Sequence, residues 1–466
     1  MKSARALVRA AEPAPLWATA RRPLQTTDRP VPRRSDVVVI GAGYTGLWTA
    51  LYLKRLNPAL DVVVVDAEGV GHGASGRNGG WCSALLPFTL TDIARQHGHQ
   101  TAVDMRLCAL NNFNDMRTVL SGLAIECDYV SGGTLTVARN RIQALRLEHE
   151  LSEARLFGAS DSDLRLLSDL SSSQHVHVSS TEGALFTPHC AALHPRKLVD
   201  GLARACLKLG VVICERSRVE HFTTGHVEIL HDDHRTSISC QWVVRATEGY
   251  TARFRDSRRT LLPLYSFMVA TEPLNEANVQ DLRWTKRETV HDARNGVVYA
   301  QLTADNRIAF GGRGAPYHYG SRIRDSFDFD DSVHASLVET LHDFFPVTRD
   351  LAITHRWGGP LGVPRDWRNF VRVDENRRVA TGGGYSGDGV SLAHLTGRMI
   401  AHAITRQPHA DLTLPWFGHE NPTWEPEPLR WLGVNTLRLL VDSIDETEQR
   451  RCRSSRIRST VVDRFF

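Results

Sequence analysis

The chain has 466 residues, of which 42% are hydrophobic and 23% are charged, and its formal net charge is +4 at pH 7. This length allows one large two-lobed unit or two to three modest domains, and the small net charge gives no reason to expect a nucleic-acid partner. The eight cysteines include no C-x-x-C pair and the histidines show no metal spacing, which argues against structural zinc and for a reducing, cytoplasmic compartment. No apolar run approaches the roughly 18–20 residues that cross a bilayer, so we expect no membrane partner.

The first predicted elements form a βαβ unit. Residues 1–34 are rich in arginine and proline without the apolar stretch of a secretory signal, so we expect a leader that packs loosely on the body. The β-branched run at 35–40 predicts a buried parallel strand, the leucines of 45–56 have helical spacing, and 61–65 predicts a second buried strand. A strand, a glycine turn, a helix and a strand within about 30 residues are typical of a nucleotide-binding unit.

Later segments continue this mixture of strands and helices. Residues 196–209 and 390–404 predict helices, 211–213 an inner strand, and 217–246 and 260–315 series of short strands. We predict an α/β fold, α+β overall, with a Rossmann-type domain that is discontinuous in sequence, a mixed β-sheet substrate domain and a helical C-terminal tail. The predicted parts are the leader (1–34), the nucleotide-binding domain (35–110, 185–250 and 350–410), the substrate domain (111–184 and 251–349) and the tail (411–466).

A glycine motif, GAGYTG, starts at Gly41 between the first strand and the first helix. Gly41 permits the tight turn, Gly43 lets the backbone approach a pyrophosphate, and Gly46 allows close packing of helix on strand. The helix N-terminus offers N–H donors and a positive dipole to the phosphates. Asp66, at the end of the second strand, would accept hydrogen bonds from a ribose. The motif in this context predicts a dinucleotide cofactor.

A second glycine loop, GHGASGRNGG, covers residues 71–80. So many glycines cannot contribute a core and cost backbone entropy when they are ordered. We interpret the loop as a second backbone cradle along a long ligand, with polar contacts from Ser75, Arg77 and Asn78. A flexible linker is the alternative interpretation.

A third glycine loop, TGGGYSGDGV, covers residues 381–390 and leads into the late helix. A glycine run before a helix N-terminus stabilises negative charge. In a flavoprotein it would face the N1–C2=O edge of the isoalloxazine, where negative charge develops on reduction. A plain connection between strand and helix is the alternative.

With these three loops the chain resembles the D-amino-acid oxidase/glycine oxidase superfamily of flavoproteins, over about residues 35–430. The second and third loops are most similar to the γ-glutamylputrescine oxidase branch. Further similar segments are residues 194–211, 243–251, 263–274, 308–314 and 354–367. The resemblance implies FAD, with its dinucleotide end on the Rossmann lobe, its adenine near the backbone of Val219, and a β-sheet substrate lobe over the flavin.

The expected FAD contacts follow from the loops and from the resemblance. They are Gly41, Gly43, Tyr44, Thr45, Gly46, Asp66, Ala67, Gly73, Ala74, Ser75, Arg77, Asn78, Gly79, Gly80, Val219, Thr247, Gly384, Tyr385, Gly387, Asp388, Gly389 and Val390. Relatives with covalent flavin use a histidine in the second loop or a cysteine shortly before the third. Here Ser75-Gly76-Arg77 fills the first place and residues 357–374 contain no cysteine, so we expect non-covalent FAD.

The superfamily oxidises a C–H bond beside an amine nitrogen, and this chemistry depends on placement more than on a strong acid or base. Arg313 or Arg356 would clamp a substrate carboxylate. Tyr265, Tyr317 and Tyr385 are further placement candidates, each with a structural role as the alternative. Asp388 would cap the late helix or attract an ammonium group. Sarcosine-oxidase-like relatives place a lysine over the flavin, whereas no lysine falls at a matching place here and Arg313 is the nearest cation, which puts fast reaction with O₂ in question.

We therefore expect an FAD-dependent amine or amino-acid oxidase or dehydrogenase. Its partners would be a small-molecule amine and either O₂ or another electron acceptor, and the protein would be a monomer or a homodimer. A flavin monooxygenase fed by NAD(P)H and a non-catalytic flavin-binding protein are the alternatives. A nicotinamide dehydrogenase is disfavoured, because the second and third glycine loops would have no task in it.

Overall fold

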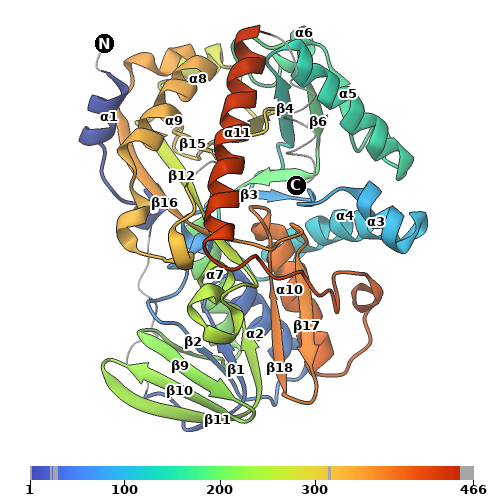
Figure 1. Ribbon diagram of the computed structural model, residues 1–466, viewed down its shortest axis with the longest axis vertical. Coiled ribbons are helices and arrows are strands. Elements are labelled where there is room, and N and C mark those ends of the chain that lie inside the picture. The colour runs from blue at the N-terminus through green and yellow to red at the C-terminus, as the bar shows by residue number, and fades with distance from the viewer. Residues whose placement is uncertain (1–2, 21–23, 25–29, 313–315, 452–466) are drawn as a thin grey trace.

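The computed structural model describes residues 3–20, 24, 30–312 and 316–451, which form two lobes (Figure 1). Each lobe is built on an eight-stranded sheet, and a two-stranded sheet of β3 (Trp81–Ser83) and β7 (Cys190–Ala192) lies between them. Helix α11 (Leu429–Arg451) runs along the outside of the upper lobe in this view. None of the described helices is both long enough and apolar enough to cross a membrane.

The sheet of the lower lobe is centred on β1. Its strands, in order across the sheet, are β17 (Phe370–Asp374), β18 (Val379–Gly383), β11 (His234–Arg245), β1 (Arg34–Ile40), β2 (Val62–Val65) and β8 (Val212–Cys214), and the strands β10 (His226–His231) and β9 (Ser217–Thr223) extend from β11. The five strands from β18 to β8 are parallel. A parallel sheet of this kind is covered on both faces, which explains the unbroken apolar run of β1.

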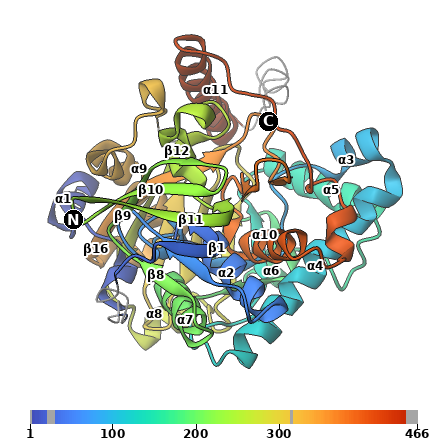
Figure 2. The same ribbon diagram turned by 90° about the horizontal axis from the view of Figure 1, so that it is seen from below.

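Alternate side chains of β1 pack into two different cores. Val37 and Val39 join the core that contains helices α2 (Tyr44–Leu56) and α10 (Gly389–Ile404). Val38 and Ile40 point the other way and pack on the β9–β10–β11 meander. Figure 2 shows α2, α7 (Pro195–Lys208) and α10 on one side of β1 and the meander on the other.

Helices α2 and α10 approach each other closely at one glycine. A Cβ atom added to Gly397 would stand 2.6 Å from the Cβ of Trp48, so only glycine fits there. The hydroxyl of Tyr52 lies 2.6 Å from Nε2 of His394 across the same contact. This packing fixes the N-termini of the two helices relative to each other.

The sheet of the upper lobe is mixed, and its two faces meet different partners. Its strands, in order, are β16 (Ile353–Val363), β12 (Leu262–Thr271), β15 (Ile308–Gly312), β14 (Val298–Leu302), β13 (Thr289–Asp292), β4 (Thr134–Ala138), β6 (Gly183–Thr187) and β5 (Arg165–Leu167). One face, with Phe267 and Phe310, packs against α9 (Asp331–Phe344) and α1 (Ala4–Ala10). The opposite face, with Met268, Trp357 and Tyr299, is turned toward the lower lobe.

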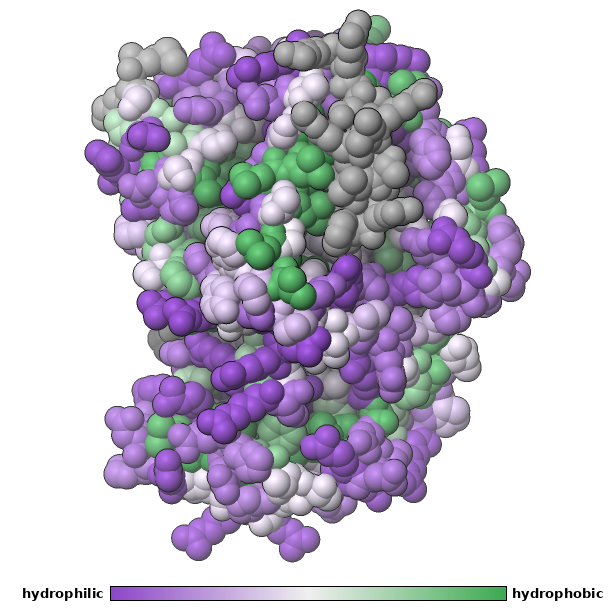
Figure 3. Space-filling view, viewed as in Figure 1, coloured by the Kyte–Doolittle hydropathy of each residue, from purple (hydrophilic) through white to green (hydrophobic). Residues whose placement is uncertain are grey.

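Two expectations about the ends of the chain have different outcomes. The expected loose packing of the leader is wrong for residues 3–18, because Val8 is fully buried and Trp17 is 2% exposed. The helical tail is confirmed: Asp445 of α11 accepts a hydrogen bond from the backbone N–H of Gly296 at 2.7 Å. Figure 3 shows small hydrophobic patches where α11 lies, on a largely hydrophilic face; the exposed apolar side chains of this helix are Leu429, Trp431, Leu432 and Leu439.

The α/β fold class is confirmed, and the predicted elements of the first βαβ unit agree with β1, α2 and β2 within one or two residues. Two limits of the predicted domain ranges do not coincide with the elements of the structure. The boundary at residue 110 falls inside α4 (His99–Gly122). Strand β16 lies within the range 350–410 that the sequence predicts for the nucleotide-binding domain, yet it pairs with β12 in the upper sheet.

Candidate functional site

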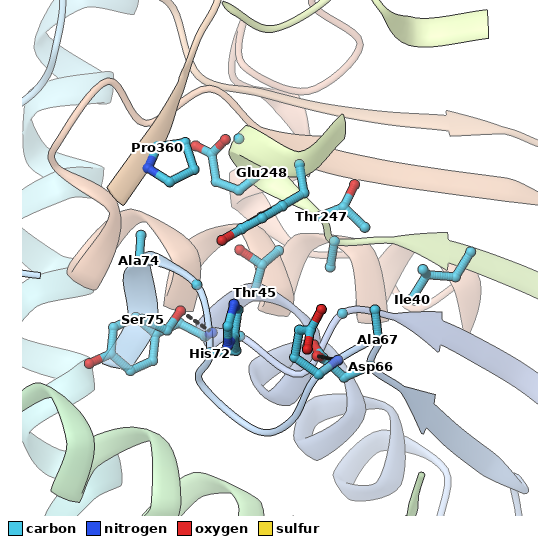
Figure 4. A pocket seen from close by; sticks show the side chains of 18 of the residues that line it. Ile40, Thr45, Asp66, Ala67, His72, Ala74, Ser75, Thr247, Glu248 and Pro360 are labelled. Atoms are coloured by element: carbon cyan, nitrogen blue, oxygen red, sulfur yellow. Dashed lines mark hydrogen bonds between the residues drawn. The ribbon is translucent and has the colours of Figure 1, made fainter. Parts of the chain in front are cut away.

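A pocket lies at the carboxyl ends of β1, β2 and β11, where Ile40, Val65 and Ala246 form part of its wall. Open parallel sheets bind nucleotides at this edge. Figure 4 shows the glycine loops below the pocket, with Thr45, Ser75 and Asp66, and the elements above it, with Glu248 and Pro360. The pocket therefore lies between the nucleotide-binding sheet and β16 of the upper sheet.

The first glycine loop has the geometry of an anion cradle. Gly41 has φ +108°, and a Cβ there would lie 2.5 Å from the carbonyl oxygen of Ala246. A Cβ at Gly46 would lie 1.9 Å from the oxygen of Gly41, so the helix can approach the turn only with glycine at this position. The first turn of α2 has N–H groups without acceptors inside the helix, and Gly41 and Gly43 line the pocket beside it. These features fit the pyrophosphate of a dinucleotide.

Asp66 closes the turn as well as lining the pocket. Its Oδ2 accepts the N–H of Ala42 at 2.8 Å, and its Oδ1 accepts those of Glu68 and Gly69, both at 3.0 Å. Burial raises the pKa of Asp66, and the three N–H donors act in the opposite direction. Glu68, which the sequence did not single out, also lines the pocket at this end, together with the predicted adenine neighbour Val219.

The second glycine loop is an ordered turn, so the linker interpretation is wrong. Oγ of Ser75 accepts the N–H of Tyr44 at 2.8 Å, and this bond joins the loop to the start of α2. Asn78 holds the loop internally, because its Oδ1 accepts the N–H of Gly80 at 2.8 Å and its Nδ2 donates to the oxygen of Ala74 at 3.0 Å. The loop thus forms one wall of the pocket with a fixed backbone.

Arg77 turns away from the pocket and forms a partly buried ion pair instead. Its Nη1 lies 2.6 Å from Oδ2 of Asp328 and also donates to the carbonyl oxygen of Gly358. Burial raises the pKa of Asp328 to about 6, against the opposing effect of the arginine. Arg77 therefore connects the second glycine loop to the upper lobe rather than presenting a cation to the pocket.

The third glycine loop is held by a residue that sequence reasoning missed. Oε1 of Glu248 accepts the N–H groups of Gly384 and Tyr385 at 3.2 and 3.1 Å. Its Oε2 is shielded from solvent and lies beside Gly362, where it occupies the space that a Cβ would need. Burial raises the pKa of Glu248 to about 7. An acidic residue three positions after the end of β11, at the carboxyl edge of the predicted sheet, was the signal that could have found it.

Tyr385 and Asp388 lie at the N-terminus of α10. The hydroxyl of Tyr385 lies 2.7 Å from Oγ1 of Thr45, which links the third loop to the first. Asp388 occupies the N-cap position, although its side chain makes no capping hydrogen bond. The neighbouring Gly389 and Val390 line the pocket, so the end of this helix faces it.

The structure does not bring the other placement candidates to the pocket. Arg356 lies on the face of β16 that meets α9 and forms an ion pair with Asp331 at 2.7 Å. Tyr265 lies on the corresponding face of β12, beside Phe267. The hydroxyl of Tyr317 donates to Glu427 near α11. Arg313 lies outside the described residues.

Side chains on the opposite face of the upper sheet meet the second glycine loop. A Cβ at Gly79 would lie 2.7 Å from the ring of Tyr299, whose hydroxyl lies 3.1 Å from Oγ of Ser266. Trp81 stands edge-on to Tyr299, with ring centroids 6.0 Å apart. Successive side chains of a strand alternate between the two faces of the sheet. The sequence did not reveal which of the two alternating sets reaches this face.

Most of the predicted cofactor residues line the pocket. They are Gly41, Gly43, Tyr44, Thr45, Asp66, Ala67, Gly73, Ala74, Ser75, Asn78, Val219, Thr247, Tyr385, Gly387, Gly389 and Val390. The predicted residues outside its lining are Gly46, Arg77, Gly79, Gly80, Gly384 and Asp388. The lining residues that the sequence did not single out are Ile40, Val65, Glu68, His72, Ser217, Arg218, Glu220, Ala246, Glu248, Gly249, Tyr250, Arg253, Phe254, Pro360, Leu361 and Ala393. No group of histidine, cysteine, aspartate and glutamate suited to a metal ion occurs among the described residues.

Comparison with known proteins gives a consistent result. A family model described as "FAD dependent oxidoreductase" (DAO) matches residues 36–403. The gamma-glutamylputrescine oxidoreductase of Escherichia coli K12 is 31% identical over 376 residues, which cover 79% of this chain and 83% of that protein. A probable oxidoreductase, OrdL, of Haemophilus influenzae is 31% identical over 379 residues, with the same coverage.

The fold has close neighbours among solved structures. Glycine oxidase from Geobacillus kaustophilus superimposes with a TM-score of 0.67 at 18% identity, over 81% of this chain and 96% of that one. The glycine cradles fit FAD, since Gly41 and Gly43 line the pocket beside the start of α2, and the close contacts at Gly41 and Gly46 leave no room for a side chain in this turn. The family match, the relatives and the cradles together lead to one conclusion: this chain belongs to the DAO family of FAD-dependent oxidoreductases.

Proposed function

We propose that this chain oxidises the C–N bond of a small amine or amino acid to an imine. The observation that carries the proposal is the position of the pocket between the nucleotide-binding sheet and β16 of the upper sheet. Its relatives support the substrate class, because they include gamma-glutamylputrescine oxidoreductase and, by fold, glycine oxidase. Bound FAD would supply the hydride acceptor, and the electrons would pass to O₂ or another acceptor.

The chain's own residues divide the work along the pocket. Gly41 and Gly43 would receive the pyrophosphate, and Asp66 with Glu68 would face the adenosine ribose. The N-terminus of α10, at Gly389, would stabilise negative charge at the other end of the cofactor. No strong acid or base is required for removal of hydride from a neutral amine. The residues that line the pocket would therefore contribute by holding the cofactor and the substrate in position.

The substrate would lie on the side of the pocket covered by the upper sheet. Trp81 and Tyr299 are half-buried beside Gly79 of the second glycine loop, outside the residues that line the pocket, and aromatic faces of this kind hold the apolar part of a small molecule. Tyr385 has its hydroxyl directed to Thr45, so its part in the site is to fix the third loop rather than to exchange a proton. Burial raises its pKa further above its usual value, in line with that part.

Anaerobic mixing of the holoenzyme with a panel of amines tests the proposal. Loss of the visible flavin absorbance with at least one amine, amino acid or polyamine derivative is the expected result. The same mixing with NADH and NADPH separates the two alternatives. Bleaching by a pyridine nucleotide with no response to any amine would favour a monooxygenase, and no response to either would favour a flavin-binding protein without catalysis.

We also propose that FAD is held without a covalent bond. His72 lines the pocket, but it lies before the expected attachment position, and burial lowers its pKa. Acid precipitation separates the cases, because non-covalent FAD passes into the supernatant. Yellow colour that stays with the pellet would contradict the proposal.

A reducing compartment suits the chain, and we propose the cytoplasm. The seven cysteines among the described residues are all buried free thiols. We further propose a monomer or a homodimer, which light scattering of the purified holoenzyme distinguishes. A larger assembly would contradict this part of the proposal.

A further inference from the structure

The N-terminal segment of residues 3–18, here called the strap, is built into the upper lobe although it precedes the region matched by the family model, residues 36–403. Val8 of its helix α1 is fully buried in the core under α9. Glu12 pairs with the edge of β16: its N–H donates to the oxygen of Thr354, and its oxygen accepts the N–H of Arg356, both at 2.9 Å. The strap is therefore anchored at Val8 and at Glu12, ahead of the segment that leads to Trp17.

Trp17 connects the strap to the second glycine loop, which forms part of the pocket wall. It is 2% exposed, and its Nε1 donates to the carbonyl oxygen of Asn78 in the second glycine loop at 2.8 Å. Its ring stands edge-on to His194, with centroids 4.9 Å apart, and to Trp357, with centroids 6.3 Å apart. The contact thus joins a residue near the start of the chain to a loop that lines the pocket.

A second indole holds the preceding carbonyl of the same loop. Nε1 of Trp357 donates to the oxygen of Arg77 at 2.8 Å. Two consecutive peptide groups, 77–78 and 78–79, are therefore each fixed by a tryptophan on the side of the upper lobe. A buried indole N–H usually finds an acceptor, and here the two acceptors are consecutive carbonyl groups of the second glycine loop.

Fixing a carbonyl also fixes the N–H of the same peptide. In a trans peptide the two groups point in opposite directions. The bond from Trp17 to the oxygen of Asn78 therefore turns the N–H of Gly79 away from the strap, and among the described residues this N–H has no acceptor. Asn78 itself lines the pocket.

We propose that Trp17 and Trp357 are positioning residues of the FAD site, and that the strap is a working part of this site rather than a terminal extension. Their indoles fix the backbone at 77–79, and this backbone sets the affinity and the environment of the bound flavin. The inference rests on FAD as the cofactor and does not depend on which substrate is oxidised.

The test compares Trp17→Phe with the parent holoenzyme. Phenylalanine keeps an aromatic ring and loses the N–H donor. We expect FAD to bind about 3- to 10-fold more weakly in apoprotein titrations, as the loss of one buried neutral hydrogen bond implies. The visible circular dichroism of the bound flavin and the affinity of its sulfite adduct should change as well. Trp431→Phe on α11 is the matched control, because Trp431 is 38% exposed and lies outside the pocket lining.

Val8→Ala separates positioning from simple stabilisation. It weakens the anchorage of the strap without touching the indole bonds. If Trp17 has only a structural role, both variants will lower the unfolding temperature of the apoprotein and leave the flavin signals of the folded holoenzyme unchanged. An FAD affinity of Trp17→Phe within twofold of the parent, with unchanged flavin dichroism, would overturn the proposal.

Trp357→Phe gives a second route to the same answer should Trp17→Phe not fold. It removes the neighbouring donor from the oxygen of Arg77, and we expect the same direction of change in FAD affinity and flavin dichroism. Where both variants fold, their effects should be non-additive, because they act on one peptide pair. Parent-like flavin properties in Trp357→Phe would also overturn the proposal.

Discussion

Replacing Glu248 by glutamine should stabilise the apoprotein above neutral pH. Burial raises the pKa of this carboxyl from 4.5 to about 7, so its ionised form is disfavoured in the folded chain. Glutamine has the same shape and keeps an oxygen for the N–H groups of Gly384 and Tyr385. The variant removes the charge and keeps an acceptor for the two hydrogen bonds that hold the third glycine loop.

The size of the effect follows from the shift of the pKa. A difference of one pKa unit corresponds to about 1.4 kcal/mol, so the full shift of Glu248 corresponds to roughly 3 kcal/mol as an upper value. Because the folded-state pKa is raised, the carboxyl causes no loss of stability below pH 4.5, an increasing loss between pH 4.5 and 7, and the full loss above pH 7. The gain from Glu248→Gln should follow the same course.

Urea unfolding of the apoprotein at pH 5 and pH 8 measures this difference. We expect Glu248→Gln to exceed the parent in free energy of unfolding by up to about 3 kcal/mol at pH 8 and by much less at pH 5. Glu420→Gln, at an exposed carboxylate, serves as the control. An equal effect of Glu248→Gln at the two pH values would refute the reasoning, and so would a loss of stability at pH 8.

Three further predictions concern the cradles. Gly46→Ala places a Cβ 1.9 Å from the oxygen of Gly41, so we expect a loss of about 3 kcal/mol or more in the unfolding free energy, measured by urea unfolding. Asp66→Asn turns an amide N–H₂ toward at least one of the backbone N–H groups that the carboxylate now accepts, and FAD should bind about 10-fold more weakly in apoprotein titrations. Tyr385→Phe removes the 2.7 Å contact with Thr45 and should lower the unfolding free energy by about 1 kcal/mol.

Each of these three predictions has a result that contradicts it. Parent-like stability of Gly46→Ala would mean that helix α2 can move away from the turn. Unchanged FAD affinity of Asp66→Asn would show that the closure of the turn does not contribute to binding. A stability loss of Tyr385→Phe that varies with pH between 5 and 8 would show that the hydroxyl takes part in an ionisation there, against its raised pKa.

The sequence by itself determined the nucleotide-binding half of the site. A strand, a glycine turn and a helix lie within one short segment, and the backbone conformation at Gly41 is a local requirement that the residue type reveals. The same holds for the start of α10, where the glycine loop precedes the helix. Local patterns of this kind can be recognised without knowing the distant contacts of the chain. This explains why most of the predicted cofactor residues line the pocket.

The tertiary structure alone decided the other half. Tyr265 and Arg356 lie on the face of the upper sheet that meets α9, because successive side chains of a strand alternate and the pairing of β12 with β16 fixes which ones face the pocket. Glu248 and Trp17 acquire their parts only from residues far away in the chain, namely Gly384 and Asn78. Contacts of this kind depend on long-range packing: the acidic residue after β11 is visible in the sequence, but its partners in the third glycine loop are not.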